Sequence, residues 1–222
     1  MNGILIINKE YGWTSHDIVA KLRGILGFKK IGHAGTLDPM ATGILVLLLG
    51  KATKLSNKMI ELEKTYFAEI TLAAVSDTYD AEGKISKLEP KEKPSLEEIR
   101  DTLKTFEGEI SQLPPIYSAK KIKGKKAYEL ARAGKEVKLD PKIVHVYKIY
   151  DLDYKYPVLK LRIDCGKGTY IRSIAHDLGE KLGTGAYLSA LRREKVGDFS
   201  LEQAYSIEDI SLEKINKQLQ II

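Results

Sequence analysis

Cysteine and tryptophan are almost missing from this 222-residue sequence, which contains one of each. With the single cysteine, Cys165, no internal disulfide can form. The four histidines show no CxxC or HExxH spacing, the patterns that are typical of zinc ligands. A disulfide scaffold is therefore excluded, and we predict that the protein holds no metal.

Long hydrophobic runs are missing as well. The apolar run from Ile44 to Leu49 falls far short of the roughly 18 residues that are needed to cross a bilayer. The opening residues, Met1 to Glu10, do not have the layout of a signal peptide. We therefore predict a soluble, cytoplasmic protein that makes no membrane contact.

The composition is that of a globular protein, with 43% hydrophobic and 30% charged residues. On a prior of roughly 100 to 200 residues per domain, the length allows one large domain or two small ones. No internal repeat and no proline- or serine-rich linker divides the chain, so we predict one domain over residues 1–222.

Hydrophobic periodicity indicates an α+β fold with a mixed, largely antiparallel sheet, because runs of strands are broken by segregated helices without a regular βαβ repeat. The glycine-rich stretch from Ile31 to Gly43 shows no usable period and is predicted to be an irregular loop. Ser15 is the expected N-cap of the first helix, and Arg172 is expected off the buried stripe of a later one. The spacing predicts helices over 15–26, 96–106 and 169–182, and strands over 66–72, 143–154 and 158–165.

Positive charge is concentrated in one segment. From Ser118 to Lys138 the sequence has eight lysines and arginines but two glutamates, so this segment carries as much net charge as the whole chain, +6. Such clustering is typical of a surface that binds a polyanion, although a solvated loop or helix face would have the same composition. The candidate binding residues are Lys120, Lys121, Lys123, Lys125 and Lys126.

The sequence GHAGTLDPMATGIL, at residues 32–45, is the clearest candidate for a catalytic loop, because a polar loop with His33 and Asp38 leads directly into a hydrophobic strand. The alternative is that Asp38, which precedes a proline, only forms a turn. Neither the P-loop spacing nor GxGxxG is present, so nucleotide hydrolysis receives little support.

Four blocks together resemble the TruB-type tRNA pseudouridine synthases, and the similarity extends over nearly the whole chain. The resemblance implies a pseudouridine synthase fold and isomerisation of uridine 55 in the T loop of tRNA, without a cofactor. The blocks are GHAGTLDPMATGIL at 32–45, KTY at 64–66, QLPPIYSAKKIKGKKAYELARAG at 112–134 and CGKGTYIRSIAHDLG at 165–179.

The implied reaction needs a carboxylate, and the resemblance assigns that role to Asp38. Uracil must be detached from the ribose at N1, turned over and rejoined through C5, and carboxylates act as covalent nucleophiles in glycosyl chemistry. The residues leave three roles open for Asp38: attack on the base, attack on the sugar, or removal of a sugar proton.

The resemblance also assigns roles to residues around Asp38. It makes Arg172 the catalytic partner of the aspartate and Tyr66 the ring that stacks on the target base. The purely structural alternatives are that Arg172 is a surface arginine and that Tyr66 is a core tyrosine. Tyr170 would line the pocket or cap a helix, and Lys64 would bind substrate.

His33 has a separate implied role, which is to occupy the place that the flipped base leaves in the RNA stack. The alternative is a histidine that caps a local turn. The basic insertion at about 112–140 would grip phosphates through Tyr117 and its lysines, and phosphate contacts position an RNA without reading its sequence.

The expected partner is the T arm of tRNA, and we predict a monomer with no protein partner. Family members commonly continue into a small PUA-type RNA-binding domain, which we predict to be absent after Ile222. The usual TDT-like sequence is present here as Ser76, Asp77 and Thr78.

Two other functions compete with this interpretation. One is a non-catalytic RNA-binding or RNA-remodelling module, in which the basic segment does the work and Asp38 forms a turn. The other is a metal-dependent hydrolase that uses Asp38, His33 and Asp80, but these residues lack any recognisable ligand spacing.

Overall fold

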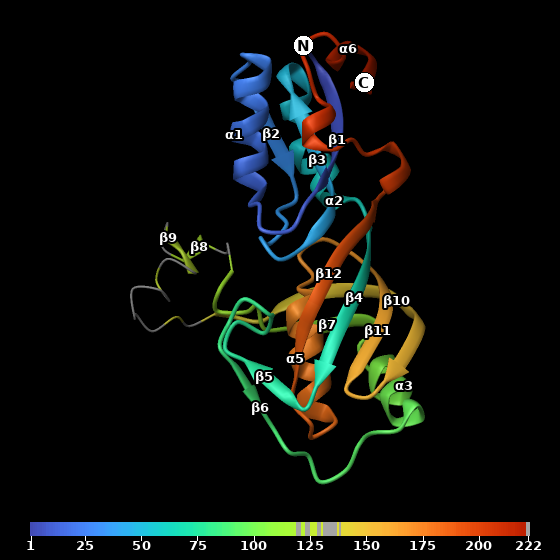
Figure 1. The fold of residues 1–222 in the computed structure, drawn as a ribbon. Helices are drawn as coiled ribbons and strands as arrows, with labels where there is room; N and C mark the ends of the chain where they lie inside the picture. The colour runs from blue at the N-terminus through green and yellow to red at the C-terminus, as the bar shows by residue number, and fades with distance from the viewer. Residues whose placement is uncertain (119–120, 123–124, 128–129, 131–136, 138, 221–222) are drawn as a thin grey trace. The chain divides into compact units, whose positions relative to one another are not determined.

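The computed structural model describes residues 1–118, 121–122, 125–127, 130, 137 and 139–220, and its chain divides into two compact units (Figure 1). Unit 1 comprises Met1–Phe67 and Leu191–Ile222, and unit 2 comprises Ala68–Ala190. Two strands, β4 (Lys64–Leu72) and β12 (Ala186–Val196), run from one unit into the other. The interpretation of residues 1–222 as one domain stays a prediction.

The centre of unit 1 is an antiparallel pair of strands. β1 (Gly3–Lys9) pairs with β3 (Thr42–Leu49), from Gly3 opposite Leu49 to Lys9 opposite Gly43. Nearly all their residues are buried, as expected of apolar strands in a sheet that is covered on both faces. The other edge of β3 pairs with β2 and, in parallel at Arg192 and Arg193, with β12.

The prediction of an irregular loop from Ile31 to Gly43 is wrong at both ends, since Thr42 and Gly43 already belong to β3. Residues Ile31–Ala34 form strand β2, with Ile31 opposite Leu49 and Ala34 opposite Val46. The local sequence has no strand period, but pairing with the long apolar strand β3 satisfies its backbone groups. The irregular part of the segment is therefore residues 35–41, which we call the Asp38 loop.

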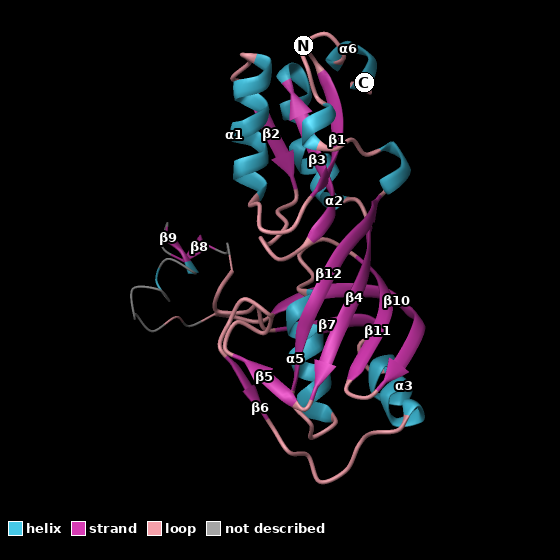
Figure 2. Ribbon diagram, in the orientation of Figure 1, coloured by secondary structure: helices cyan, strands magenta, loops and turns pink. Residues whose placement is uncertain are grey.

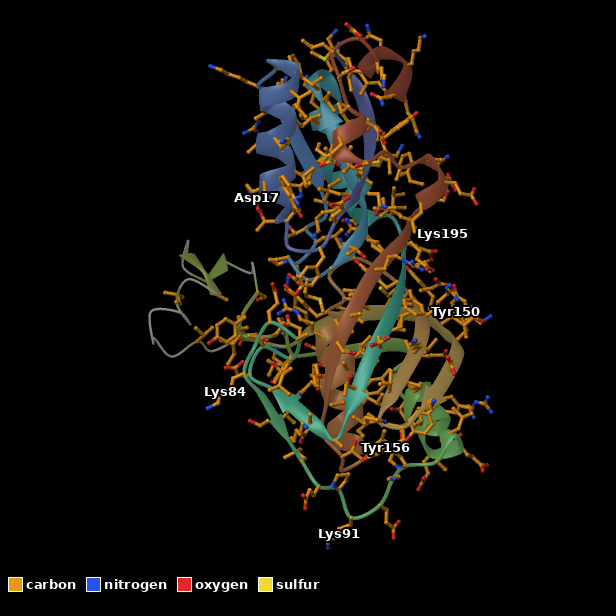
Figure 3. All side chains as sticks on the ribbon, viewed as in Figure 1. Asp17, Lys84, Lys91, Tyr150, Tyr156 and Lys195 are labelled. Carbon is orange, nitrogen blue, oxygen red and sulfur yellow. The ribbon has the colours of Figure 1, made fainter. Side chains whose placement is uncertain are left out.

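The first helix, α1 (Ser15–Leu26), has the predicted bounds, but its N-cap lies one residue before the predicted cap, Ser15. Thr14 is the N-cap: its hydroxyl accepts the Asp17 N–H at 3.1 Å, while the Asp17 carboxylate accepts the Thr14 N–H at 2.9 Å. This capping box leaves Ser15 free to turn inward. Asp17 lies in the first turn of the helix (Figure 3).

Short elements complete unit 1. The predicted helical tail after Ser206 is a 3-10 turn followed by a short helix, and beyond it Gln220 exchanges backbone hydrogen bonds with Ile4 on the free edge of β1. The elements are η1 (Gly50–Leu55), α2 (Ser56–Glu61), β13 (Phe199–Ser200), η2 (Leu201–Gln203), η3 (Ile207–Asp209) and α6 (Ile215–Gln218).

In unit 2 the strand order is β12-β4-β11-β10-β7. The predicted hairpin is confirmed: β10 (Lys142–Lys155) pairs antiparallel with β11 (Val158–Cys165). β10 also pairs antiparallel with β7 (Gly108–Gln112). Together with its helices, this sheet confirms the predicted α+β class (Figure 2).

Two helices pack within unit 2. α3 (Leu96–Lys104) begins at the predicted Ser95–Glu98 capping box and contacts both β10 and α5 (Ile171–Lys181). Along the described part of the chain, no helix is both long and apolar enough to cross a membrane. The remaining strands are β5 (Ala74–Ser76) with β6 (Ile85–Lys87), and β8 (Lys121–Ile122) with β9 (Lys125–Lys126).

Candidate active site

The Asp38 loop is held by a buried lysine at the end of β1. The Lys9 side chain is fully buried, and its ammonium donates hydrogen bonds to the carbonyls of Trp13 at 2.7 Å, Glu10 at 2.9 Å and Pro39 at 3.2 Å. The Pro39 carbonyl also accepts the Gly12 N–H at 2.9 Å. A buried ammonium needs such partners, so the backbone next to Asp38 cannot move without exposing or orphaning a charge.

Ser15 and Arg193 anchor the same loop from two other sides. The buried Ser15 hydroxyl accepts the Leu37 N–H at 2.9 Å. Arg193 is 1% exposed, and its guanidinium donates to the Ile44 carbonyl at 2.7 Å and to the Gly35 carbonyl at 3.1 Å. Sequence reasoning missed these anchors, since no motif distinguishes them from exposed polar residues.

Gly43, in β3 just after the Asp38 loop, is a position that only glycine can occupy. Its φ is +96°, and a Cβ at this position would lie 2.2 Å from the Arg193 carbonyl oxygen. Any side chain would therefore force β3 away from β12. Asp38 itself is half-buried, and its carbonyl accepts the Ala41 N–H at 3.1 Å, so the residue does form a turn. This turn involves only the backbone of Asp38, so the catalytic role of its carboxylate stays a prediction.

His33 lies on β2, shortly before the loop, and is half-buried. Among the described residues, its buried Nδ1 has no hydrogen-bond partner. The His16 ring meets it edge-on, with the ring centroids 5.3 Å apart. Burial, together with the positive charges of His16 and Arg193, lowers the pKa of His33 to about 4. The imidazole is therefore neutral at physiological pH.

Lys64 and Tyr66 lie on the buried face of β4. The Lys64 ammonium donates to the carbonyls of Ile60 and Leu62, at the end of α2, so it caps that helix. Tyr66 is 9% exposed, as expected of an inward-facing strand tyrosine. Their assigned roles in substrate binding and base stacking stay predictions.

The expected position of Arg172 off the buried stripe of α5 is wrong. The residue is 4% exposed, and its Nη1 forms an ion pair with Asp80 Oδ2 at 3.0 Å. The guanidinium also donates to the Thr78 carbonyl at 3.2 Å and the Tyr117 carbonyl at 3.1 Å. Helical spacing placed it on a polar face, but the loops of unit 2 cover that face.

The sequence names Asp80 only in the metal-dependent hydrolase alternative, but the structure makes it a functional candidate of another kind, the partner of Arg172. Asp80 is 2% exposed, its Oδ1 accepts the Glu82 N–H at 3.0 Å, and its backbone bridges to Leu188 of β12. The sequence signal that could have identified Asp80 is an acidic loop that follows the half-buried strand β5. The sequence alone did not reveal that its carboxylate is buried against Arg172.

Tyr79, next to Asp80, is held in a strained conformation. Its φ is +65°, which is rare for a bulky residue, and its ring stacks on that of His176 with centroids 3.8 Å apart. The Leu188 N–H donates to the Tyr79 carbonyl at 3.0 Å. Since His176 lies one turn after Arg172 on α5, the stack braces the loop that presents Asp80.

Tyr170 occupies the N-cap position of α5, so it does lie at the helix start. Gln112, which is buried, clamps it: Oε1 accepts the Tyr170 N–H at 2.7 Å, and Nε2 donates to the Tyr170 carbonyl at 3.0 Å. The Ser173 hydroxyl donates to the Leu113 carbonyl at 2.8 Å. These bonds join the QLPP and GTYIRS blocks.

The structure thus groups the predicted residues by unit. Asp38, His33, Lys64 and Tyr66 belong to unit 1, whereas Arg172 and Tyr170 belong to unit 2, so the pairing of Asp38 with Arg172 stays a prediction. Of the basic residues, Lys120 and Lys123 lie outside the described residues. Lys121, Lys125 and Lys126 belong to the β8–β9 hairpin, in which Lys121 is opposite Lys126. Within the described ranges, no group of three or more histidine, cysteine or acidic residues could hold a metal ion.

Comparison with known proteins adds independent information. A family model described as "TruB family pseudouridylate synthase (N terminal domain)" matches residues 23–171, and one described as "tRNA pseudouridylate synthase B C-terminal domain" matches residues 172–220. The chain is 48% identical over 219 residues to a tRNA pseudouridine synthase B of Dehalococcoides mccartyi, covering 99% of this chain and 73% of that one.

Two further matches agree with these. A tRNA pseudouridine synthase B of Clostridium tetani is 44% identical over 217 residues, with 98% of this chain and 75% of the relative covered. The solved structure of a Cbf5–Nop10–Gar1 complex matches with a TM-score of 0.73 and 31% identity. This match covers 93% of the present chain, which spans about half, 53%, of the solved chain.

The buried Asp80–Arg172 pair generates a stability prediction. Asp80→Asn should lower the free energy of unfolding by about 3–5 kcal/mol, because it leaves the buried guanidinium without its counter-charge. Asp101→Asn is the matched control, since it breaks the exposed Lys104–Asp101 pair and should cost at most about 1 kcal/mol. Urea denaturation measures both, and equal costs would contradict the prediction.

The pKa of His33 generates a second prediction. A proton or carbon NMR titration of the folded protein should find His33 neutral down to a pH near 4, well below its ordinary value of 6.5. Between these values the unfolded state binds more protons, so stability should fall as the pH drops through this window. His16→Asn should raise the pKa of His33, since one positive neighbour is removed, and His33→Gln should flatten the pH dependence. A midpoint near 6.5 in the folded protein would contradict the assignment.

Proposed function

The chain belongs to the TruB family of pseudouridine synthases, and from this membership we propose that it isomerises uridine 55 in the T loop of tRNA to pseudouridine. The family match confirms the predicted resemblance and fold. The observation that carries the proposal to the level of residues is the Asp38 loop, in which a carboxylate sits on a backbone that three buried polar side chains hold in place.

The reaction conserves all atoms of the nucleotide except for protons. The bond between N1 of uracil and C1′ of ribose breaks, a bond between C5 and C1′ forms, and the proton on C5 leaves while N1 gains one. No oxidant, reductant or water is consumed, so we propose that no cofactor or metal takes part. Asp38 starts the reaction, by one of the three roles that its chemistry allows.

Arg172 is proposed to hold the Asp38 carboxylate ionised and aimed at the substrate. Its guanidinium is itself held by Asp80 and by the carbonyls of Thr78 and Tyr117, which supports a fixed rather than a mobile cation. We assign Asp80 as a positioning residue that acts through Arg172. A group that is oriented before the substrate arrives need not be reorganised during the reaction.

The other predicted residues are proposed to hold the RNA. Tyr66 stacks on the extruded base, Tyr170 lines the pocket, and Lys64, the first residue of β4, binds substrate. The lysines of the 112–140 insertion, with Tyr117, contact phosphates of the T arm. We propose a monomer that acts on tRNA in the cytoplasm without a protein partner.

His33 is proposed to fill the gap that the flipped uridine leaves. The lowered pKa supports this role, because a neutral imidazole enters a base stack without the cost of desolvating a charge. The absence of a bond to its Nδ1, within the described residues, leaves the ring able to adapt to RNA.

The first test replaces Asp38 by asparagine. Asp38→Asn should reduce tritium release from tRNA labelled at C5 of uridine by at least about 10²- to 10⁴-fold, the range that a positioned acid or base alone contributes. Binding of the RNA should persist, because the lysines supply the affinity. Asp198→Asn, in an exposed turn of the same unit, is the control and should react like the wild type. Substantial turnover by Asp38→Asn would refute the role, and a wild type that binds tRNA but releases no tritium would indicate a non-catalytic binding module.

The second test concerns His33. On a folded T-arm hairpin, His33→Ala should slow the reaction by about 10-fold or more, since extruding a stacked base costs a few kcal/mol. The loss should be smaller on a substrate whose target uridine is already unstacked. Single-turnover tritium release compares the two RNAs. An equal loss on both would instead make His33 a general acid or base, because a proton transfer is needed whatever the starting stack.

A further inference from the structure

Tyr79 lies between the two residues whose oxygens hold Arg172. The Nη1 of Arg172 donates to the Thr78 carbonyl at 3.2 Å and to Oδ2 of Asp80 at 3.0 Å. The backbone between these two oxygens must bend so that both face one nitrogen, and Tyr79 is the single residue between them. The conformation of Tyr79 therefore decides whether Thr78 and Asp80 can hold the guanidinium together.

That conformation is strained. Tyr79 has a φ of +65°, a region in which the Cβ of an L-residue crowds the backbone, so that glycine is the residue usually found there. In the described part of the chain, the other non-glycine residues with positive φ are Ala73 and Asp151, and both have smaller side chains. A strained residue persists where its surroundings hold it, and such residues cluster at functional sites. The strain at Tyr79 therefore points to contacts that fix its conformation.

Two backbone hydrogen bonds hold the loop at Tyr79. Its N–H donates to the Ser76 carbonyl at 3.1 Å, and its carbonyl accepts the Leu188 N–H at 3.0 Å. Neither bond involves the side chain, so any residue that can adopt this φ could form both. The backbone bonds therefore explain the turn, but they do not explain a tyrosine in a conformation that favours glycine.

The ring of Tyr79 supplies a further contact. It stacks on the imidazole of His176, with ring centroids 3.8 Å apart and an angle of 6° between the planes. His176 follows Arg172 by four residues in α5, so the two side chains are neighbours on one face of the helix. The loop is thus attached to α5 at two adjacent points, by the Asp80–Arg172 ion pair and by the stack. Two attachments prevent the loop from rotating about either one.

The stack acts through the shape of the rings. Burial and the carboxylates of Asp177 and Glu180 raise the pKa of Tyr79, so its phenol stays neutral at physiological pH. Within the described residues, the hydroxyl of Tyr79 forms no hydrogen bond. A phenylalanine ring would therefore serve the same purpose.

We propose that Tyr79 and His176 are positioning residues, which act on the reaction through Asp80 and Arg172. Their stack keeps the Thr78 carbonyl and the Asp80 carboxylate on one guanidinium, and so keeps that guanidinium in the orientation in which it serves Asp38. The proposal rests on the proposed function, since it takes Arg172 to be the partner of Asp38. The stack should affect the chemical step and leave RNA binding unchanged, because its effect reaches the substrate only through oriented groups.

Three variants of position 79 separate the ring from the backbone. Tyr79→Phe keeps the ring, Tyr79→Ala removes the ring but keeps the strain, and Tyr79→Gly removes both. The matched control is Tyr147→Ala, which breaks the His145–Tyr147 ring contact on β10, where the centroids are 4.6 Å apart. Single-turnover tritium release over a series of enzyme concentrations gives the maximal rate and the half-saturating concentration for a T-arm hairpin. Thermal melting gives the stability.

We expect Tyr79→Ala and Tyr79→Gly to lower the maximal rate by about 10- to 100-fold, because a small misplacement of a catalytic group has effects of this size. The half-saturating concentration should change less than about twofold, and Tyr79→Phe and Tyr147→Ala should match the wild type. Tyr79→Gly should melt at a higher temperature than Tyr79→Ala, since glycine adopts the positive φ without strain.

Two results at position 79 would overturn the proposal. If Tyr79→Gly is folded and as fast as the wild type, the ring is dispensable for the reaction. If Tyr79→Phe is as slow as Tyr79→Ala, the hydroxyl matters and not the stack.

The histidine gives an independent test of the same stack. His176→Ala should lower the maximal rate as Tyr79→Ala does, whereas His176→Phe keeps a flat ring and should restore most of it. Because the two rings act as a unit, the double variant Tyr79→Ala, His176→Ala should be no slower than the slower single variant. Losses that multiply, as at independent sites, would overturn the proposal.

The design also keeps this proposal distinct from the proposed function. A wild type without tritium release refutes the enzymatic activity, whereas normal release in the wild type together with a normal rate in His176→Ala refutes only the stack. If neither Tyr79→Ala nor Tyr79→Gly is folded, His176→Ala decides, because alanine is the best helix former and keeps α5 intact. A wild-type maximal rate in that variant would overturn the proposal.

Discussion

Buried cations that donate to backbone carbonyls hold the loops of the candidate site. Lys9 binds the Pro39 carbonyl and Arg193 the Gly35 carbonyl of the Asp38 loop. Arg172 binds the carbonyls of Thr78 and Tyr117 as well as the Asp80 carboxylate. A buried charge is costly unless acceptors surround it, so each of these side chains restrains the loops that supply its acceptors. Irregular segments, which lack ladder hydrogen bonds of their own, thereby become rigid.

Rigid loops suit a reaction in which a glycosidic bond is broken and remade within one nucleotide. The enzyme must orient a carboxylate and exclude alternative positions of the base, and orientation that exists before binding is not lost again in the transition state. Tyr79 shows the backbone cost of this arrangement, since it has a positive φ angle beside Asp80, whereas Gly43 adopts its positive φ without strain. The surrounding bonds stabilise these conformations.

Charge is divided between two tasks. Within unit 1, the half-buried His33 stays neutral because of its burial and its positive neighbours, whereas Lys29 and Lys30, just before the same strand, are exposed. A neutral ring suits a base stack, and exposed cations suit phosphates.

The sequence by itself determined what depends on neighbouring residues: the Ser95–Glu98 capping box, the β10–β11 hairpin, the α+β class, and the irregular loop that carries Asp38. Only the tertiary structure decided that Ile31–Ala34 is a strand, that Arg172 is buried against Asp80, and that the Lys30 carbonyl accepts the Gly50 N–H. The physical reason is how far apart in the sequence the interacting residues lie. Caps, turns and periodicity act over a few residues, whereas these three features depend on partners far away in the chain, such as Leu49 for Ile31 and Asp80, 92 residues from Arg172. No local pattern encodes such pairs, because they form only when the whole chain packs.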